Sequence, residues 1–97
     1  MKRNDVLRIL QKERQELVDR YHISTLSVFG SVARDDASQD SDVDILVEFS
    51  RPVGLFQFIE LQQTLETLLG CKVDLGTPRS LKSRNKEQVL KEAIRVT

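Results

Sequence analysis

Residues 42–49, DVDILVEF, carry the pattern that most constrains the fold of this chain. Side chains of a β-strand alternate between the two faces of a sheet, so the apolar residues and the acidic residues of this stretch separate. One face receives Val43, Ile45, Val47 and Phe49, and the other receives Asp42, Asp44, Leu46 and Glu48. The apolar face needs a cover of helices, which predicts a sheet with carboxylates on its other, open face.

The rest of the chain predicts the elements around this strand. Helical spacing predicts a helix over residues 5–21, capped by Asn4 or Asp5. A second helix, 55–69, ends at Gly70, and its apolar stripe is formed by Leu55, Phe58, Leu61, Leu65 and Leu68. Shorter patterns predict strands at 25–30 and 71–76, a short helix at 31–34 and a last helix at 81–96. The order predicts one α/β domain, residues 1–97, with a small mixed sheet, helices packed on one face and the active site on the open face.

Charge and composition limit the function classes. Fifteen basic and fifteen acidic residues cancel among the 97, so the chain has no general attraction for nucleic acid or for an acidic membrane. Cys71 is the only cysteine, which excludes an internal disulfide and argues against a cysteine metal site. No apolar run reaches the ~18 residues of a spanning helix. We expect a cytoplasmic domain that contacts neither membrane nor nucleic acid directly.

Three aspartates are candidates for a metal site. Asp42 and Asp44 project from the same face of their strand, and Asp74 projects from the corresponding face of the strand at 71–76. If the two strands are neighbours in register, the three carboxylates converge and raise one another's pKa unless a cation neutralises them. Oxygen ligands without histidine or cysteine favour Mg²⁺ or Mn²⁺, which suits phosphoryl or nucleotidyl transfer.

A glycine–serine pair precedes the carboxylates. Gly30 ends a predicted strand, where a glycine lets the backbone approach a ligand closely, and Ser31 opens a short helix whose N–H groups can meet a phosphate. Arg34 either adds a cation or pairs with an acidic neighbour. Each feature alone has an ordinary structural explanation: glycine–serine pairs are common in turns, and an Asp-x-Asp pair is often a solvated strand edge. Their order and spacing together favour a phosphate-and-metal site.

The stretch GSVARDDASQDSDVDILV resembles the signature of the nucleotidyltransferase superfamily that includes DNA polymerase β. It is most similar to the minimal stand-alone members, the prokaryotic MNT-domain proteins that accompany a HEPN-domain partner. One departure is Asp35, because many relatives have a glycine at this position. The matching residues are Gly30-Ser31, Ala33-Arg34, Ser41-Asp42-Val43-Asp44 and, on a later strand, Asp74.

The resemblance implies the nucleotidyltransferase fold and transfer of AMP from ATP, with pyrophosphate leaving. Asp42, Asp44 and Asp74 are then the catalytic and metal-binding residues, with two Mg²⁺ ions expected and Asp74 helping to deprotonate the acceptor. The implied nucleotide-binding residues are Gly30, Ser31, Arg34 and Ser41. The implied role is that of an antitoxin that modifies a tyrosine of a HEPN ribonuclease toxin.

Two other functions remain open. A binding-only antitoxin would inhibit its partner by steric contact, and a third possibility is nucleotidyl transfer to a small molecule or to RNA. Phe56 lies off the apolar stripe of its helix, so it belongs either to a partner or oligomer surface or under the 51–54 loop. His22 is expected to be a surface or capping residue, and Cys71 a small core residue.

Overall fold

The computed structural model describes residues 2–34, 42–80 and 83–97. Within these ranges, four strands form one sheet in the order β3-β2-β1-β4. They are β1 (Ile23–Phe29), β2 (Val43–Phe49), β3 (Val73–Gly76) and β4 (Ile94–Arg95). β2 is antiparallel to β1 and parallel to β3, whereas β4 is antiparallel to β1, so the sheet is mixed, as predicted.

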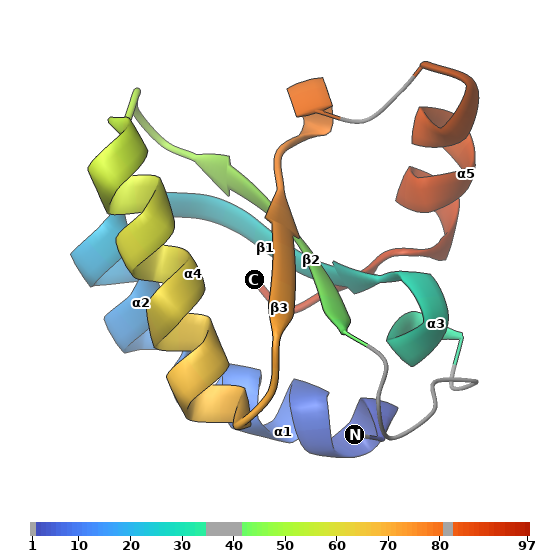
Figure 1. Cartoon of the computed structure of the whole chain (residues 1–97), viewed down its shortest axis with the longest axis horizontal. Coiled ribbons are helices and arrows are strands. Elements are labelled where there is room, and N and C mark those ends of the chain that lie inside the picture. Colours follow the sequence, from blue (N-terminus) through green and yellow to red (C-terminus); the bar gives the residue numbers. More distant parts are fainter. Residues whose placement is uncertain (1, 35–41, 81–82) are drawn as a thin grey trace.

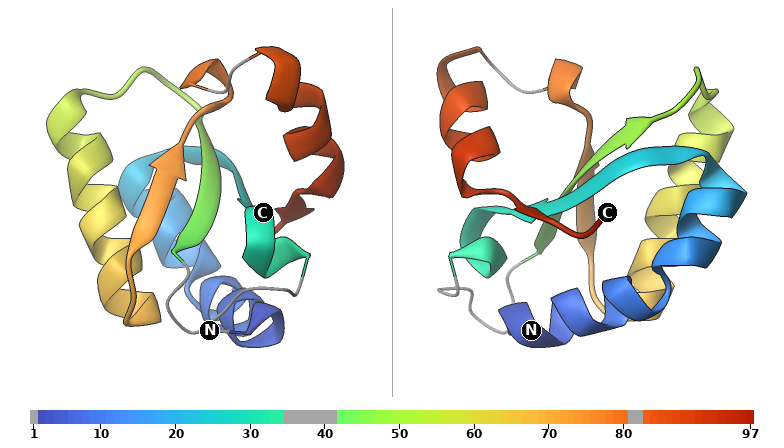
Figure 2. Two further views of the ribbon diagram at one scale, coloured as in Figure 1. Left: turned by 45° about the vertical axis from the view of Figure 1, so that its right-hand side comes forward. Right: turned by 180° about the vertical axis from the view of Figure 1, so that it is seen from behind.

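The helices lie on both sides of this sheet. They are α1 (Arg3–Lys12), α2 (Arg14–Tyr21), α3 (Gly30–Ala33), α4 (Leu55–Leu69) and α5 (Ser83–Glu92), with a 3₁₀ turn, η1 (Pro78–Ser80), after β3. Figure 1 shows α2 and α4 on one side, α1 beneath, and α3 and α5 on the other side. The two views of Figure 2 show the same arrangement. The face of the sheet opposite α2 and α4 is therefore partly covered by α3 and α5 rather than wholly open.

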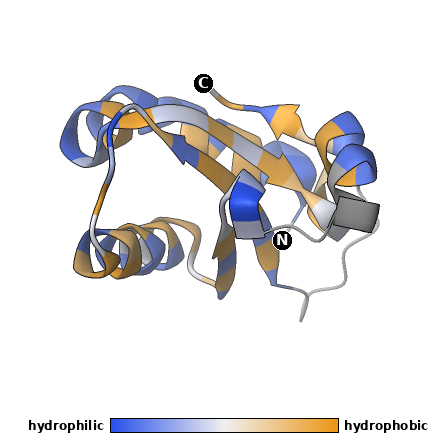
Figure 3. Ribbon diagram, turned by 90° about the horizontal axis from the view of Figure 1, so that it is seen from above, coloured by the Kyte–Doolittle hydropathy of each residue, from blue (hydrophilic) through white to orange (hydrophobic). Residues whose placement is uncertain are grey.

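The core lies between the sheet and α1, α2 and α4. Val43, Ile45 and Val47 are fully buried in it, as the alternation of β2 predicted. Figure 3 shows hydrophobic residues along the strands and hydrophobic stripes on helices with hydrophilic outer faces. Leu46, on the same face as Asp44, is also buried at 4% exposure but is not part of this cluster. Among the described residues, no helix combines the length and the apolar character needed to cross a membrane.

The prediction of one continuous helix over residues 5–21 is wrong, because the structure has two helices there. The chain bends at Glu13, which has φ −94° and ψ 3° and separates α1 from α2. The polar run 11–16 makes no buried contact that would require a straight helix, so α1 can pass beneath the sheet while α2 runs beside it. The predicted caps are also wrong, because Lys2 is the N-cap of α1 and no side chain caps it. His22 does cap a helix: it is the C-cap of α2 in the left-handed conformation, with φ 57°.

The last predicted helix, 81–96, is also wrong at its C-terminal end. α5 ends at Glu92, and Ile94 and Arg95 form β4, in register with Val28 and Ser27 of β1. The N–H of Val96 donates to the carbonyl oxygen of Leu26 at 2.7 Å. An unpaired strand edge leaves backbone groups without partners, and this tertiary pairing overrides the local helical pattern.

α4 matches its prediction in extent, but its buried stripe is shifted. It ends at Gly70, which has φ 70° and donates its N–H to the carbonyl oxygen of Glu66. Its buried residues are Leu61, Leu65 and Leu69, while Leu55, predicted to belong to the stripe, is 70% exposed. Phe56 is 89% exposed and therefore forms outer surface rather than packing under the preceding loop.

Leu65→Ala tests the contribution of this stripe. Leu65 is fully buried, so its truncation is expected to lower the free energy of unfolding by about 2–5 kcal/mol, because a cavity replaces apolar contacts. Phe56→Ala is the control on the same helix and should change the value by less than about 0.5 kcal/mol. Urea unfolding of both variants measures the difference, and equal effects would show that α4 is not anchored through this stripe.

Candidate active site

Asp44 and Asp74 lie side by side at the start of two parallel strands. They are direct partners in the register of β2 and β3, and, second to burial, the negative charge of Asp74 raises the pKa of the Asp44 carboxyl group. The sequence-based prediction that these two strands are neighbours in register is confirmed.

Burial and like charge disfavour the ionised form of Asp44. Desolvation is the largest cause that raises the pKa of its carboxyl group, followed by the negative charges of Asp74 and Asp42. Arg34 acts in the opposite direction but does not cancel these effects. Among the described residues, the charge of Arg34 therefore offsets this repulsion only in part, and a bound cation would relieve the remainder.

Asp42 stands at the outer end of this group. It precedes β2 and its side chain is exposed, whereas Asp44 is half-buried. In the part of the chain that the structure describes, no three histidine, cysteine, aspartate or glutamate side chains are gathered closely enough to hold a metal ion by themselves. Asp74, the register partner of Asp44, and Asp42 both act on Asp44 through their negative charges.

Gly30 brings the end of β1 against Asp44. Phe29, the last residue of β1, is the register partner of Asp44, and Gly30 begins α3 with φ 73°. A Cβ atom added to Gly30 would lie 3.1 Å from Cγ of Asp44 and would overlap its Oδ2. Both the positive φ and this close approach require glycine. Ser31 follows in α3 and is half-buried, so of the predicted pair it is Gly30 that the structure places against a carboxylate.

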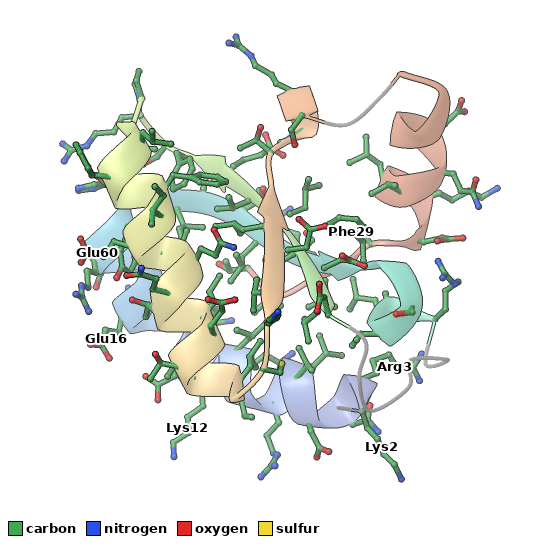
Figure 4. The ribbon with its side chains drawn as sticks, viewed as in Figure 1. Lys2, Arg3, Lys12, Glu16, Phe29 and Glu60 are labelled. Atoms are coloured by element: carbon green, nitrogen blue, oxygen red, sulfur yellow. The ribbon has the colours of Figure 1, made fainter. Side chains whose placement is uncertain are left out.

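Arg34 follows α3 and pairs with α5. Its Nη1 lies 3.2 Å from Oε2 of Glu92, which is the acidic neighbour left open by the sequence, and its charge also lowers the pKa of Asp44. Sequence reasoning missed Glu92, because no local pattern reveals that α5 packs beside α3. Figure 4 labels Arg3 near the same helix, where its Nη1 donates to the carbonyl oxygen of Ala33 at 3.4 Å. Ser41 and Asp35 lie outside the described residues.

A cleft of about 790 Å³ lies at the opposite end of β2. It is formed by the last residues of that strand, the 50–54 loop, the start of α4 and the segment 77–79. None of the described residues of the predicted site lines it. We locate the candidate chemistry at the carboxylates rather than in this cleft, because the raised pKa of Asp44 and the close backbone approach of Gly30 occur together there.

Comparisons with known proteins agree with this geometry. The family model described as Nucleotidyltransferase domain matches residues 7–96. The protein adenylyltransferase MntA of Thermococcus cleftensis is 47% identical over 88 residues, covering 91% of this chain and 89% of that protein. A solved structure assigned as a minimal nucleotidyltransferase is 41% identical, with a TM-score of 0.81 and coverage of 97% of this chain and 95% of the other.

A more distant structure supports the fold alone. It is the MNT antitoxin in complex with the tri-AMPylated HEPN toxin of Shewanella oneidensis, at 22% identity and a TM-score of 0.67. The similarity covers 94% of this chain and 71% of the other. The family match over nearly the whole chain, together with the 47% identical relative, is decisive for classification. This chain therefore belongs to the nucleotidyltransferase domain family.

Proposed function

We propose that this chain transfers AMP from ATP to a protein hydroxyl group, and that the acceptor is a tyrosine of a HEPN ribonuclease toxin for which it is the antitoxin. The observation that carries the proposal is the register pairing of Asp44 with Asp74 beside the backbone of Gly30. The name of one relative, a protein adenylyltransferase, supports the chemistry, and the HEPN partner is proposed by analogy with an antitoxin of the same fold that binds an AMPylated HEPN toxin.

The proposed reaction is a single displacement at the α-phosphorus of ATP. The acceptor oxygen forms a bond to that phosphorus, the bond to the oxygen that bridges the α- and β-phosphates breaks, and pyrophosphate leaves. Asp74 would accept the hydroxyl proton, since it is exposed and within reach of an entering acceptor. Gly30 and Ser31 would hold the β- and γ-phosphates through backbone N–H groups and the serine hydroxyl. Arg34 and Ser41 would complete the nucleotide site.

The donor set suits Mg²⁺. All candidate ligands are carboxylate oxygens, and the pKa of Asp44 is raised by burial and then by repulsion from Asp74 and Asp42, which a cation would relieve. Magnesium commonly uses one or two protein carboxylates and completes its shell with substrate phosphates and water, so a preformed cage of three side chains is not required. Asp42, Asp44 and Asp74 would hold the ions, which would stabilise the charge that develops on the phosphates.

Label transfer tests this proposal. With ATP labelled at the α-phosphate, the co-expressed HEPN protein should become radioactive, whereas ATP labelled at the γ-phosphate should leave it unlabelled. EDTA should abolish the transfer and added Mg²⁺ should restore it, because the carboxylates need a cation to bind the anionic substrate. Labelling from the γ-phosphate would indicate a kinase, and undiminished labelling in EDTA would exclude the metal-dependent mechanism.

A binding-only antitoxin is the second candidate. The exposure of Leu55 and Phe56 at the start of α4 favours it, because large apolar side chains on a surface often mark a protein contact. The two functions separate in cells that express the toxin. Phe56→Ala should weaken protection if steric binding neutralises the toxin, and loss of catalytic carboxylates should leave protection intact.

A further inference from the structure

β3 carries Asp74 but is held by the sheet on one side only. It contains four residues, pairs with β2, and is the edge strand of the described sheet. A short edge strand has few ladder hydrogen bonds to fix its position, and its outward N–H and C=O groups need other partners. Figure 1 shows α4 running beside β3 along this edge.

Two side chains of α4 occupy the outer edge of β3. Nε2 of Gln62 donates to the carbonyl oxygen of Val73 at 3.0 Å, and the N–H of Val73 donates to Oε2 of Glu66 at 3.1 Å. Residues four apart on a helix share one face, so Gln62 and Glu66 act on Val73 together. Both side chains are half-buried, where a hydrogen bond is electrostatically stronger than it is in water.

The short connection from α4 to β3 is fixed at both ends. The backbone carbonyl oxygen of Glu66 accepts the N–H of Gly70 at 2.8 Å. Two residues later, the carbonyl oxygen of Lys72 accepts the N–H of Val43 at 3.0 Å, where β2 begins. These hydrogen bonds lie next to the first residue pair between β2 and β3, which is Val43 with Val73. The next pair is Asp44 with Asp74.

We infer that Gln62 and Glu66 are positioning residues that hold Val73 and thereby set Asp74 beside Asp44. The inference rests on the proposed function, in which these two aspartates act together. A strand that slips by one residue turns every side chain to the opposite face, so the register at Val73 decides whether Asp74 faces the active site or the core. Glu66 acts as a hydrogen-bond acceptor in this arrangement, and its charge is not needed at the reacting atoms.

Kinetics of three variants test the inference. Glu66→Ala removes the acceptor and should lower kcat for AMP transfer by about tenfold to a hundredfold, since small misplacements of a catalytic group have effects of this size. The KM for ATP should change by less than about twofold, because Gly30 and Ser31 stay in place. Glu66→Gln keeps an acceptor and should restore kcat. Gln63→Ala, an exposed position on the same helix, is the control and should match the wild type.

Amide hydrogen exchange gives a readout that needs no acceptor protein. In Glu66→Ala, the amides of Val73 and Val43 should exchange at least about tenfold faster, while the amides of β1 keep their wild-type rates. Unchanged exchange at Val43, or an unchanged kcat despite faster exchange, overturns the inference. A wild-type chain that transfers no AMP overturns the proposed function instead, and the exchange rates then decide separately whether Glu66 holds the register.

Discussion

Asp44→Asn is expected to lower AMP transfer by at least about a thousandfold, because several kcal/mol of transition-state charge stabilisation would depend on the metal that these carboxylates are proposed to hold. Asparagine keeps the size of the side chain but removes its charge and one acceptor oxygen. Single-turnover rates with α-labelled ATP measure the effect. Glu48→Gln is the matched control: it lies on the same face of β2, is exposed, and accepts a hydrogen bond from Oγ1 of Thr25 at 3.2 Å. Its rate should equal that of the wild type.

The same variant should be more stable than the wild type in the absence of metal. The pKa of Asp44 is raised in the folded chain by burial and by its acidic neighbours, so the folded state holds this proton more tightly than the unfolded state. The resulting stabilisation is fully present below the unfolded value, about 3.9, and is lost as the pH rises through the higher folded value.

A pair of thermal unfolding series in EDTA measures this difference. At a pH below about 3.9, Asp44 is protonated in both states, and the Tm values of wild type and Asp44→Asn should nearly coincide. As the pH rises to neutrality, the wild type should fall below the variant. A variant that is less stable than the wild type at neutral pH would contradict the electrostatic account. Added Mg²⁺ should raise the Tm of the wild type and leave the variant nearly unchanged.

Local patterns were sufficient to predict the carboxylate face. The period of a strand fixes the relative placement of Asp42 and Asp44 without any tertiary information, and the same period oriented Asp74. The positive φ of Gly30 is likewise a local property that glycine permits. These features confine the chemistry to one end of β2, which explains why the sequence alone identified the family.

Features that depend on distant partners were not predicted. β4 forms because the edge of β1 offers hydrogen bonds to Ile94 and Arg95, although the local pattern favoured a helix. The pairing of Arg34 with Glu92 depends on how α5 packs beside α3. The contacts of Gln62 and Glu66 with Val73 depend on the direction in which α4 passes the edge of β3. In each case the interaction joins segments that are far apart in the sequence, and no local pattern shows that they are close in space.

The site therefore combines two kinds of constraint. Strand periodicity and a glycine determine which side chains face the site. The packing of α4 and α5 determines the positions of those side chains. Gly30 is subject to both a local and a tertiary constraint. Its positive φ and its close approach to Asp44 each exclude a side chain at this position. Substitution of this residue should consequently affect stability and activity together.

Gly30→Ala and Gly70→Ala separate these two contributions. Both glycines have nearly the same left-handed conformation, with φ 73° and φ 70°, so each alanine variant should lose about 1–2 kcal/mol from backbone strain. A Cβ atom at Gly70 meets nothing within 4 Å, whereas at Gly30 it overlaps the Asp44 carboxylate. Gly30→Ala should therefore be the less stable variant, by an amount that reflects displacement of Asp44.

Activity should distinguish the two variants even more clearly. Gly70→Ala leaves the carboxylates in place and should retain the wild-type rate of AMP transfer at a temperature where it is folded. Gly30→Ala displaces Asp44 from Asp74 and should lose about a hundredfold in kcat, the effect expected when a reacting group moves by about 1 Å. Urea unfolding and single-turnover labelling of both proteins measure the two effects. Equal rates would mean that the close approach of Gly30 to Asp44 is not needed for the reaction, and equal stabilities would mean that the strand relaxes without loss.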